Sequence, residues 1–165
     1  MKKIFLLFVF TLFVFYGCKK TEMSTYYLIR HAEKIKTDAD NRNPYLNEKG
    51  LKRADNWAKY FKNIKIDAVY STNYHRTIQT AKPTAESKNL EIIKYDPRKL
   101  YDETFRAETK GKNLLIIGHS NTTPAFANKI LGEKKFLNMN ENNNSSLYVV
   151  TVSGDKKTSK VITVN

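Results

Sequence analysis

The apolar run Leu-Leu-Ile-Ile at 114–117 constrains the fold more than any other stretch of this chain. Consecutive apolar residues in a strand point to both of its faces, so protein must cover both faces. Such strands are typical of parallel sheets that carry helices on each side. Predicted strands and helices also alternate along the rest of the chain. We therefore expect an α/β protein, a three-layer α/β/α sandwich with a mostly parallel central sheet.

The predicted elements end in a C-terminal hairpin. Residues 147–152 and 160–164 alternate in polarity around the turn residues Ser153-Gly154-Asp155, which predicts two antiparallel strands. The Asn-rich stretch 138–144 is expected to be a solvated loop, and Asn47 is a plausible N-cap of the first helix. The other predicted strands cover residues 25–29, 66–70, 90–95 and 113–117, and the predicted helices cover residues 48–62, 77–87, 99–109 and 123–131.

The first eighteen residues have the pattern of a secretion signal. Lys2 and Lys3 precede the apolar stretch 4–16, which is shorter than the about 20 residues that a membrane-spanning helix needs. Gly17 and Cys18 follow directly. Because Cys18 is the only cysteine, no intramolecular disulfide can form.

The Gly-Cys pair resembles a bacterial lipoprotein lipobox, in which the cysteine is lipidated and becomes the first mature residue. Phe15 and Tyr16 are bulkier than the residues that usually precede Gly-Cys, so an ordinary cleaved signal and an uncleaved anchor remain alternatives. With lipidation, the protein would be exported to the bacterial cell envelope and anchored to the membrane through an N-terminal lipid. The expected divisions are a signal peptide at 1–17, a tether at 18–24 that begins with Cys18, and one domain at 25–165.

The charge balance favours anionic partners. The chain has 29 Lys and Arg against 16 Asp and Glu, a formal net charge of +13. A positive surface attracts phosphate esters, nucleic acids and acidic lipids alike. The chain lacks the stripe of basic and aromatic residues that single-strand binders use, so no nucleic-acid partner is expected. The sequence leaves the oligomeric state open.

Chemically active side chains follow the predicted strands where these end. Arg30 and His31 follow the first strand, Arg76 lies shortly after the second, and His119 follows the fourth. Because ligands bind beyond the carboxyl ends of parallel strands, we expect these four side chains around one site. Guanidinium groups bind the oxygens of a phosphate dianion, and a neutral imidazole can attack phosphorus. This set of residues therefore favours phosphoryl transfer.

The segments LIRHAEK, VYSTNYHRTIQTA and LLIIGHSNTTP resemble, in this order, the three signature segments of the histidine phosphatase superfamily, which has the phosphoglycerate-mutase-like fold. The resemblance covers essentially all of residues 25–164. It implies that His31 is the nucleophile that carries the phosphoryl group. It also implies that Arg30, Arg76 and His119 hold the phosphate. The implied partner is a small phosphorylated substrate, and no metal or organic cofactor is implied.

The resemblance leaves the general acid open, because that motif varies within the family. A carboxylic acid is expected to protonate the leaving oxygen. Asp96 is the preferred candidate because it directly follows the third predicted strand. Asp102 and Glu103, on the following segment, are its rivals.

Two other kinds of site can be weighed against this reading. Ser120 follows Gly-His as the serine does in the nucleophile elbow of an α/β-hydrolase. Such a triad needs a histidine further along the chain, and His119 is the last one. A zinc site built from the three histidines lacks ligand-like spacing, and neighbouring arginines would repel the cation.

The short spacing between the motifs bears on the reaction. Only 42 residues separate Arg76 from His119, which leaves no room for the long insertion that closes the site in related mutases. An open site admits water, so we expect a phosphatase that hydrolyses phosphomonoesters through a phosphohistidine on His31. A phosphohistidine protein phosphatase or a mutase of the same fold is one alternative. A non-catalytic, anion-binding envelope lipoprotein is another.

Overall fold

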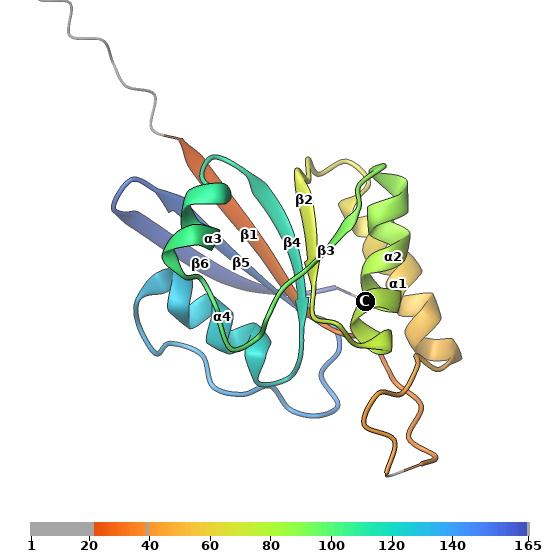
Figure 1. The fold of residues 1–165 in the computed structure, drawn as a ribbon. Helices are drawn as coiled ribbons and strands as arrows, with labels where there is room; N and C mark the ends of the chain where they lie inside the picture. The colour runs from red at the N-terminus through yellow and green to blue at the C-terminus, as the bar shows by residue number, and fades with distance from the viewer. Residues whose placement is uncertain (1–21, 39, 165) are drawn as a thin grey trace, which may run out of the picture.

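Six strands form one sheet in the order β3-β2-β4-β1-β5-β6 (Figure 1). The computed structural model describes residues 22–38 and 40–164. Strands β3, β2, β4 and β1 run parallel, and β5 and β6 follow as an antiparallel hairpin, as predicted. The strands are β1 (Met23–Arg30), β2 (Ala68–Ser71), β3 (Ile92–Lys94), β4 (Asn113–Gly118), β5 (Ser146–Ser153) and β6 (Lys156–Thr163).

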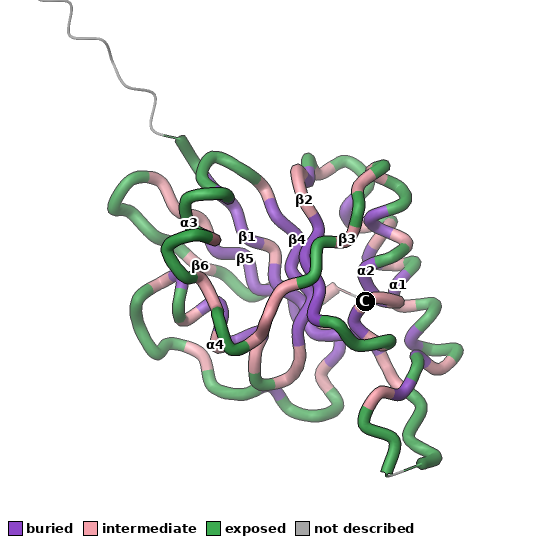
Figure 2. The backbone as a smooth tube through the Cα atoms, in the orientation of Figure 1, coloured by how far each residue is buried: buried purple, intermediate pink, exposed green. Residues whose placement is uncertain are grey.

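Helices cover both faces of the sheet, which confirms the predicted three layers. Helices α1 (Glu48–Phe61) and α2 (His75–Ser87) pack on one face, and α3 (Glu103–Glu108) and α4 (Thr122–Leu131) pack on the other (Figure 1). Burial is concentrated along the central strands (Figure 2).

The apolar run of β4 shows why two helical layers are required. Leu115 and Ile117 pack with Trp57 of α1, whereas Leu114 and Ile116 pack with Phe126 of α4. All four β4 side chains are 0–1% exposed. The alternation of strand side chains therefore divides one continuous apolar sequence between two cores.

The ends of the helices follow the local sequence, with one correction. Asn47 caps α1 as predicted, since its Oδ1 accepts from the Gly50 amide at 2.9 Å. The predicted helix at 99–109 is shorter, because Tyr101 has a φ of 52° and cannot continue a right-handed helix. Asp102 then caps α3, its Oδ1 accepting from the Phe105 amide at 2.8 Å.

The parallel register brings three strand ends to one edge of the sheet. Arg30 at the end of β1 lies opposite Gly118 of β4, and Ser71 of β2 lies opposite Ile117. The ladder extends one step further, because the amide of His31 donates to the Gly118 carbonyl at 3.0 Å. Residues that follow β1, β2 and β4 therefore emerge side by side, as the site prediction requires.

The predictions of a signal peptide and of lipidation at Cys18 lie outside the described residues, as does most of the tether. Within 22–38 and 40–164, no helix is both long and apolar enough to cross a bilayer.

Candidate active site

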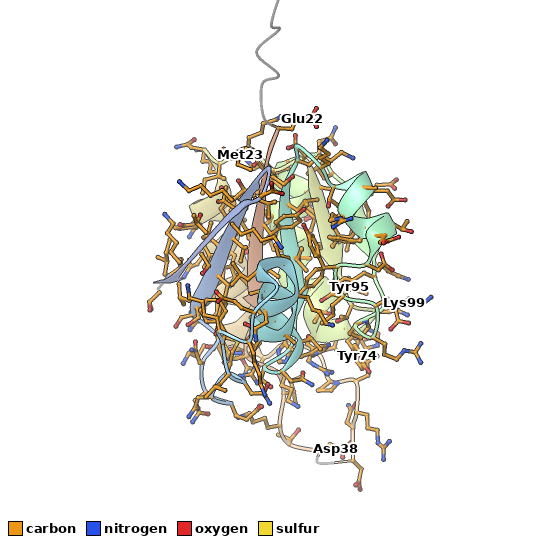
Figure 3. All side chains as sticks on the ribbon, turned by 90° about the vertical axis from the view of Figure 1, so that its left-hand side faces the viewer. Glu22, Met23, Asp38, Tyr74, Tyr95 and Lys99 are labelled. Atoms are coloured by element: carbon orange, nitrogen blue, oxygen red, sulfur yellow. The ribbon has the colours of Figure 1, made fainter. Side chains whose placement is uncertain are left out.

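Four predicted site residues come together at this edge of the sheet. Arg30, His31, Arg76 and His119 line one cavity of about 390 Å³. The imidazole rings of His31 and His119 lie with their centroids 5.5 Å apart. Tyr74, which also lines the cavity, lies toward the end of the molecule opposite Met23, where β1 begins (Figure 3). The cavity therefore sits at the carboxyl ends of the parallel strands.

The ring of His31 is held in one tautomer. Its Nδ1 lies 2.8 Å from the carbonyl oxygen of Ala32, and a carbonyl can only accept, so Nδ1 carries the proton. Burial lowers the pKa of His31 to about 3, and the charges of Arg30 and Arg76 act in the same direction. The ring is therefore neutral near neutral pH, and its Nε2 carries a free lone pair.

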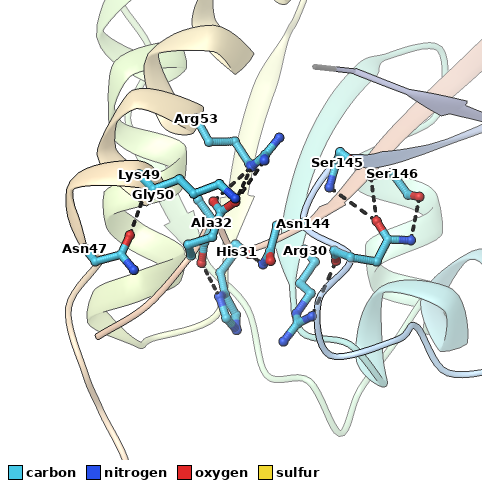
Figure 4. A network of polar contacts seen from close by, with 12 residues as sticks. Arg30, His31, Ala32, Asn47, Lys49, Gly50, Arg53, Asn144, Ser145 and Ser146 are labelled. Atoms are coloured by element: carbon cyan, nitrogen blue, oxygen red, sulfur yellow. Dashed lines mark hydrogen bonds and ion pairs between the residues drawn. The ribbon is translucent and has the colours of Figure 1, made fainter. Parts of the chain in front are cut away.

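The backbone around His31 is fixed by contacts from two distant segments. The amide of Ala32 donates to Thr80 Oγ1 at 2.9 Å. The side-chain amide of Asn144 donates to the His31 carbonyl at 2.8 Å (Figure 4). Gln79 Oε1 accepts from the Leu46 amide at 2.8 Å. The Gln-Thr pair of the second motif thus supports the loop that carries the first.

Helix α1 also contacts this loop closely. Arg53 binds both carboxylate oxygens of Glu33 at 2.8–3.0 Å (Figure 4). A Cβ at Gly50 would lie only 2.1 Å from the Glu33 carbonyl oxygen, so this position has no room for a side chain. Glu33 therefore ties the His31 loop to α1 and does not contact the His31 ring.

His119 is oriented by a chain of hydroxyl groups. Thr72 Oγ1 donates to Thr77 Oγ1 at 3.0 Å, so it must accept from His119 Nε2, which lies 2.9 Å away. The His119 Nδ1 then faces an Arg76 Nη2 at 3.4 Å. Burial lowers the pKa of His119 to about 4, with Arg76 the next largest cause.

The guanidinium group of Arg76 packs against the Tyr74 ring beside the cavity. Its guanidinium carbon lies 4.4 Å from the centre of the Tyr74 ring, a cation–π contact. One Nη donates to the Arg42 carbonyl at 3.2 Å, and among the described residues its buried Nε has no partner. The group therefore retains donors for an anion.

Arg30 is engaged by the loop that precedes β5. Its Nη1 donates to the carbonyls of Asn140, Glu141 and Asn143 at 2.8–3.4 Å, and its Nη2 donates to Glu141 Oε2 at 2.7 Å. The buried Nε has no partner within the described part of the chain. The loop at 138–144 therefore binds Arg30. The expectation that this loop would be merely solvated was wrong.

The three predicted acids lie outside the cavity. Asp96 is bound on both oxygens by Arg98 at 2.8–3.1 Å, and hydrogen bonds from Arg98 lower the pKa of Asp96 to about 2. A carboxyl group with so low a pKa is a poor proton donor near neutral pH. Asp102 is used as the cap of α3, and Glu103 is exposed in its first turn.

Sequence patterns missed several residues at the site. Thr72 orients His119, Tyr74 covers Arg76, and Asn144 holds His31. Glu141 lines the cavity and contacts both Arg30 and Ser120. The Asn-rich composition of their loop predicted only a turn, so nothing in the sequence pointed to Glu141.

A second cavity of about 390 Å³ adjoins the first and shares Arg30, His31, Lys34 and Glu141 with it. Its other cations are Lys36 and Lys49, and its remaining acidic group, Glu33, is already paired with Arg53. The surroundings of the site are therefore strongly positive.

The alternative sites find no support among the described residues. Ser120 Oγ donates to Glu141 at 2.7 Å, while the His119 ring contacts Thr72 and Arg76, so no Ser-His pair forms. No group of three or more potential metal ligands occurs in residues 22–38 and 40–164.

This chain is similar to known proteins in part of its sequence and in its fold. Residues 26–98 match the model of the histidine phosphatase superfamily (branch 1). Phosphoserine phosphatase 1 of Hydrogenobacter thermophilus is 38% identical over 73 residues, which are 42% of this chain and 35% of that protein. The match thus spans about a third of the relative's length.

Two solved structures extend the likeness over most of the chain. The protein histidine phosphatase SixA, complexed with tungstate, superposes with a TM-score of 0.68 at 17% identity, covering 84% of this chain and 96% of that one. The phosphoglycerate mutase of Bacillus anthracis strain Sterne gives a TM-score of 0.65 at 16% identity, covering 87% and 94%. Such low identities establish the shared fold. Together with the family-model match over residues 26–98, they show that this chain is similar to proteins of the histidine phosphatase superfamily.

Proposed function

We propose that this chain is a phosphatase that hydrolyses phosphomonoesters through a phosphohistidine on His31. The observation that carries the proposal is the state of the His31 ring. Its Nδ1 proton is held by the Ala32 carbonyl, and Nε2 is unprotonated at a cavity lined by Arg76 and His119. A neutral imidazole so oriented is ready to attack phosphorus.

The reaction divides into two transfers. His31 Nε2 attacks phosphorus, the P–N bond forms, and the bond to the ester oxygen breaks as that oxygen takes up a proton. A water molecule then attacks the phosphohistidine, which releases inorganic phosphate and restores the neutral ring. Arg76 stabilises the charge on the transferring oxygens in both steps, and His119 lines the same cavity.

The shape of the site favours hydrolysis over the mutase alternative. Between β2 and β4 the chain holds only α2, β3 and α3, and the cavity is lined there by Tyr74, Arg76 and Pro97. Water can therefore reach a phosphohistidine. The same open site could admit a phosphohistidine on a protein. A protein phosphatase therefore remains an alternative, and a comparison of substrates can distinguish it.

Turnover by the purified chain tests this proposal. We expect p-nitrophenyl phosphate hydrolysis by the wild type, a loss of at least about 10³-fold in His31→Ala, and a smaller loss in Arg76→Ala. His75→Ala is the matched histidine control, since His75 stacks on Tyr45 at 4.1 Å outside the cavity. Binding of inorganic phosphate with no turnover of any phosphoester or phosphohistidine peptide would favour the non-catalytic alternative.

We also propose that the protein is a lipoprotein of the bacterial cell envelope, lipidated on Cys18. The sequence supports this through Lys2-Lys3, the apolar stretch 4–16 and Gly17-Cys18. Metabolic labelling with a radioactive fatty acid should mark the wild type and leave Cys18→Ser unlabelled. Unlabelled wild-type protein in the membrane fraction would instead indicate an uncleaved anchor.

A further inference from the structure

Glu141 occupies the position of an anion in the free site. Its Oε2 accepts from Arg30 Nη2 at 2.7 Å, and its Oε1 accepts from Ser120 Oγ at 2.7 Å. Ser120 also fixes the loop itself, because its carbonyl accepts from the Met139 amide at 2.8 Å. A carboxylate thus bridges Arg30, which lines the cavity, and a hydroxyl just before α4.

Among the residues that the structure describes, the only carboxylates lining the two cavities are those of Glu33 and Glu141. Glu33 is bound on both oxygens by Arg53 and lies 3.6 Å from Lys49, which holds it on α1. The side chain of Glu141 is 72% exposed although its carboxylate reaches the buried Arg30. It therefore stands at the mouth of the cavity, where the leaving oxygen of a substrate must lie once its phosphoryl group faces His31.

We propose that Glu141 is the general acid of the reaction, a role that rests on the phosphatase function proposed above. A phosphate dianion competes with the Glu141 carboxylate for Arg30 and displaces it. The carboxyl group then lies next to two negative charges and is no longer paired with the guanidinium. Both changes favour its protonated form.

The proton balance follows from this position. As His31 Nε2 bonds to phosphorus and the ester bond breaks, the Glu141 carboxylic acid gives its proton to the leaving oxygen. The resulting carboxylate then accepts a proton from the water that attacks the phosphohistidine, which returns Glu141 to its protonated state.

The charged groups that face Glu141 are Arg30 and Lys34, both cationic. In the free site the hydrogen bond from the Ser120 hydroxyl, together with these cations, lowers the pKa of Glu141, so the bound phosphate must reverse the shift.

Leaving-group dependence tests this role in the full chain, purified in detergent. kcat/KM is measured for p-nitrophenyl phosphate, which has an acidic leaving group, and for phenyl phosphate, whose leaving phenol has a pKa near 10. In Glu141→Gln we expect phenyl phosphate hydrolysis to fall by about 10²-fold or more. p-Nitrophenyl phosphate hydrolysis should fall by less than about tenfold, because its leaving group needs little protonation.

Glu133→Gln is the matched control, since Glu133 is exposed beyond α4, and both of its rates should equal those of the wild type.

Equal losses on the two substrates in a folded Glu141→Gln variant, or no loss, would overturn the inference. Should Glu141→Gln fail to fold, Glu141→Ala serves instead, and it should show the same larger loss on phenyl phosphate because alanine also lacks a carboxyl group. Wild-type turnover of both substrates with an unchanged rate ratio in the variants would refute Glu141 as the acid and leave the proposed phosphatase standing. An inactive wild type would refute both.

Discussion

Two histidines that stay neutral, His31 buried and His119 half-buried, are the unusual residues of this site. His31 is 4% exposed and shares its cavity with the cations Arg30 and Arg76, so protonating it would add a third positive charge there. The sequence predicted both histidines at the site, because their positions after β1 and β4 follow from the strand pattern. It could not predict their tautomers, which depend on the Ala32 carbonyl and the Thr72 hydroxyl.

The neutral His31 makes stability depend on pH. Its pKa is about 3 in the folded chain and near 6.5 in the unfolded chain, so the unfolded state binds more protons between these values. Stability is therefore lost as pH falls below about 6.5. We expect the free energy of unfolding in urea to fall between pH 7 and pH 5 by roughly 2 kcal/mol more in the wild type than in His31→Asn. An equal pH dependence in the two proteins would contradict the buried, neutral ring.

Thr80 provides a second test at this scale. Its Oγ1 accepts from the Ala32 amide, so Thr80→Val leaves a buried donor unpaired and loosens the His31 loop. We expect a loss of about 1–3 kcal/mol in stability and a fall in kcat, measured by urea unfolding and p-nitrophenyl phosphate turnover. Thr158→Val on the exposed face of β6 should change neither. Unchanged turnover in Thr80→Val would show that the hydrogen bond does not position His31.

At the scale of elements, the strands and the first helix were the most predictable. Apolar strands and the periodic face of α1 arise from local sequence, and Asn47 marks the start of the helix. The α3 boundary was not predictable, because it depends on the left-handed conformation of Tyr101. The loop 138–144 was misjudged for a related reason, since its contacts with Arg30 and His31 join residues more than 100 positions apart.

Gly50 tests how closely α1 must approach the His31 loop. In an exposed helix, replacing glycine by alanine stabilises by up to about 1 kcal/mol. Here the new Cβ would overlap the Glu33 carbonyl oxygen, so we expect Gly50→Ala to destabilise by about 1–3 kcal/mol and to lower turnover. Thermal unfolding measures the stability of Gly50→Ala. Lys52→Ala, on the exposed face of α1, is the control. A stabilised Gly50→Ala would show that the helix and the loop are not in close contact.

At the scale of the whole molecule, the parallel topology assembles the site from distant segments. The site residues come from three parts of the chain: Arg30 and His31, Arg76, and His119. The sheet register aligns the ends of β1, β2 and β4, after which these residues follow, at one edge. This convergence was predictable because parallel strands end together. The identity of the acid was not, because Glu141 enters from a loop that no strand end positions.

The central claim is that His31 carries the phosphoryl group. The full chain is mixed briefly with p-nitrophenyl phosphate, quenched in alkali, where phosphohistidine survives, and digested for peptide mass spectrometry. We expect phosphate on the peptide that contains His31 at Nε2, its loss on acid treatment, and no modification in His31→Asn. Phosphate on Ser120 or His119, or steady turnover in His31→Asn at the wild-type rate, would contradict the account.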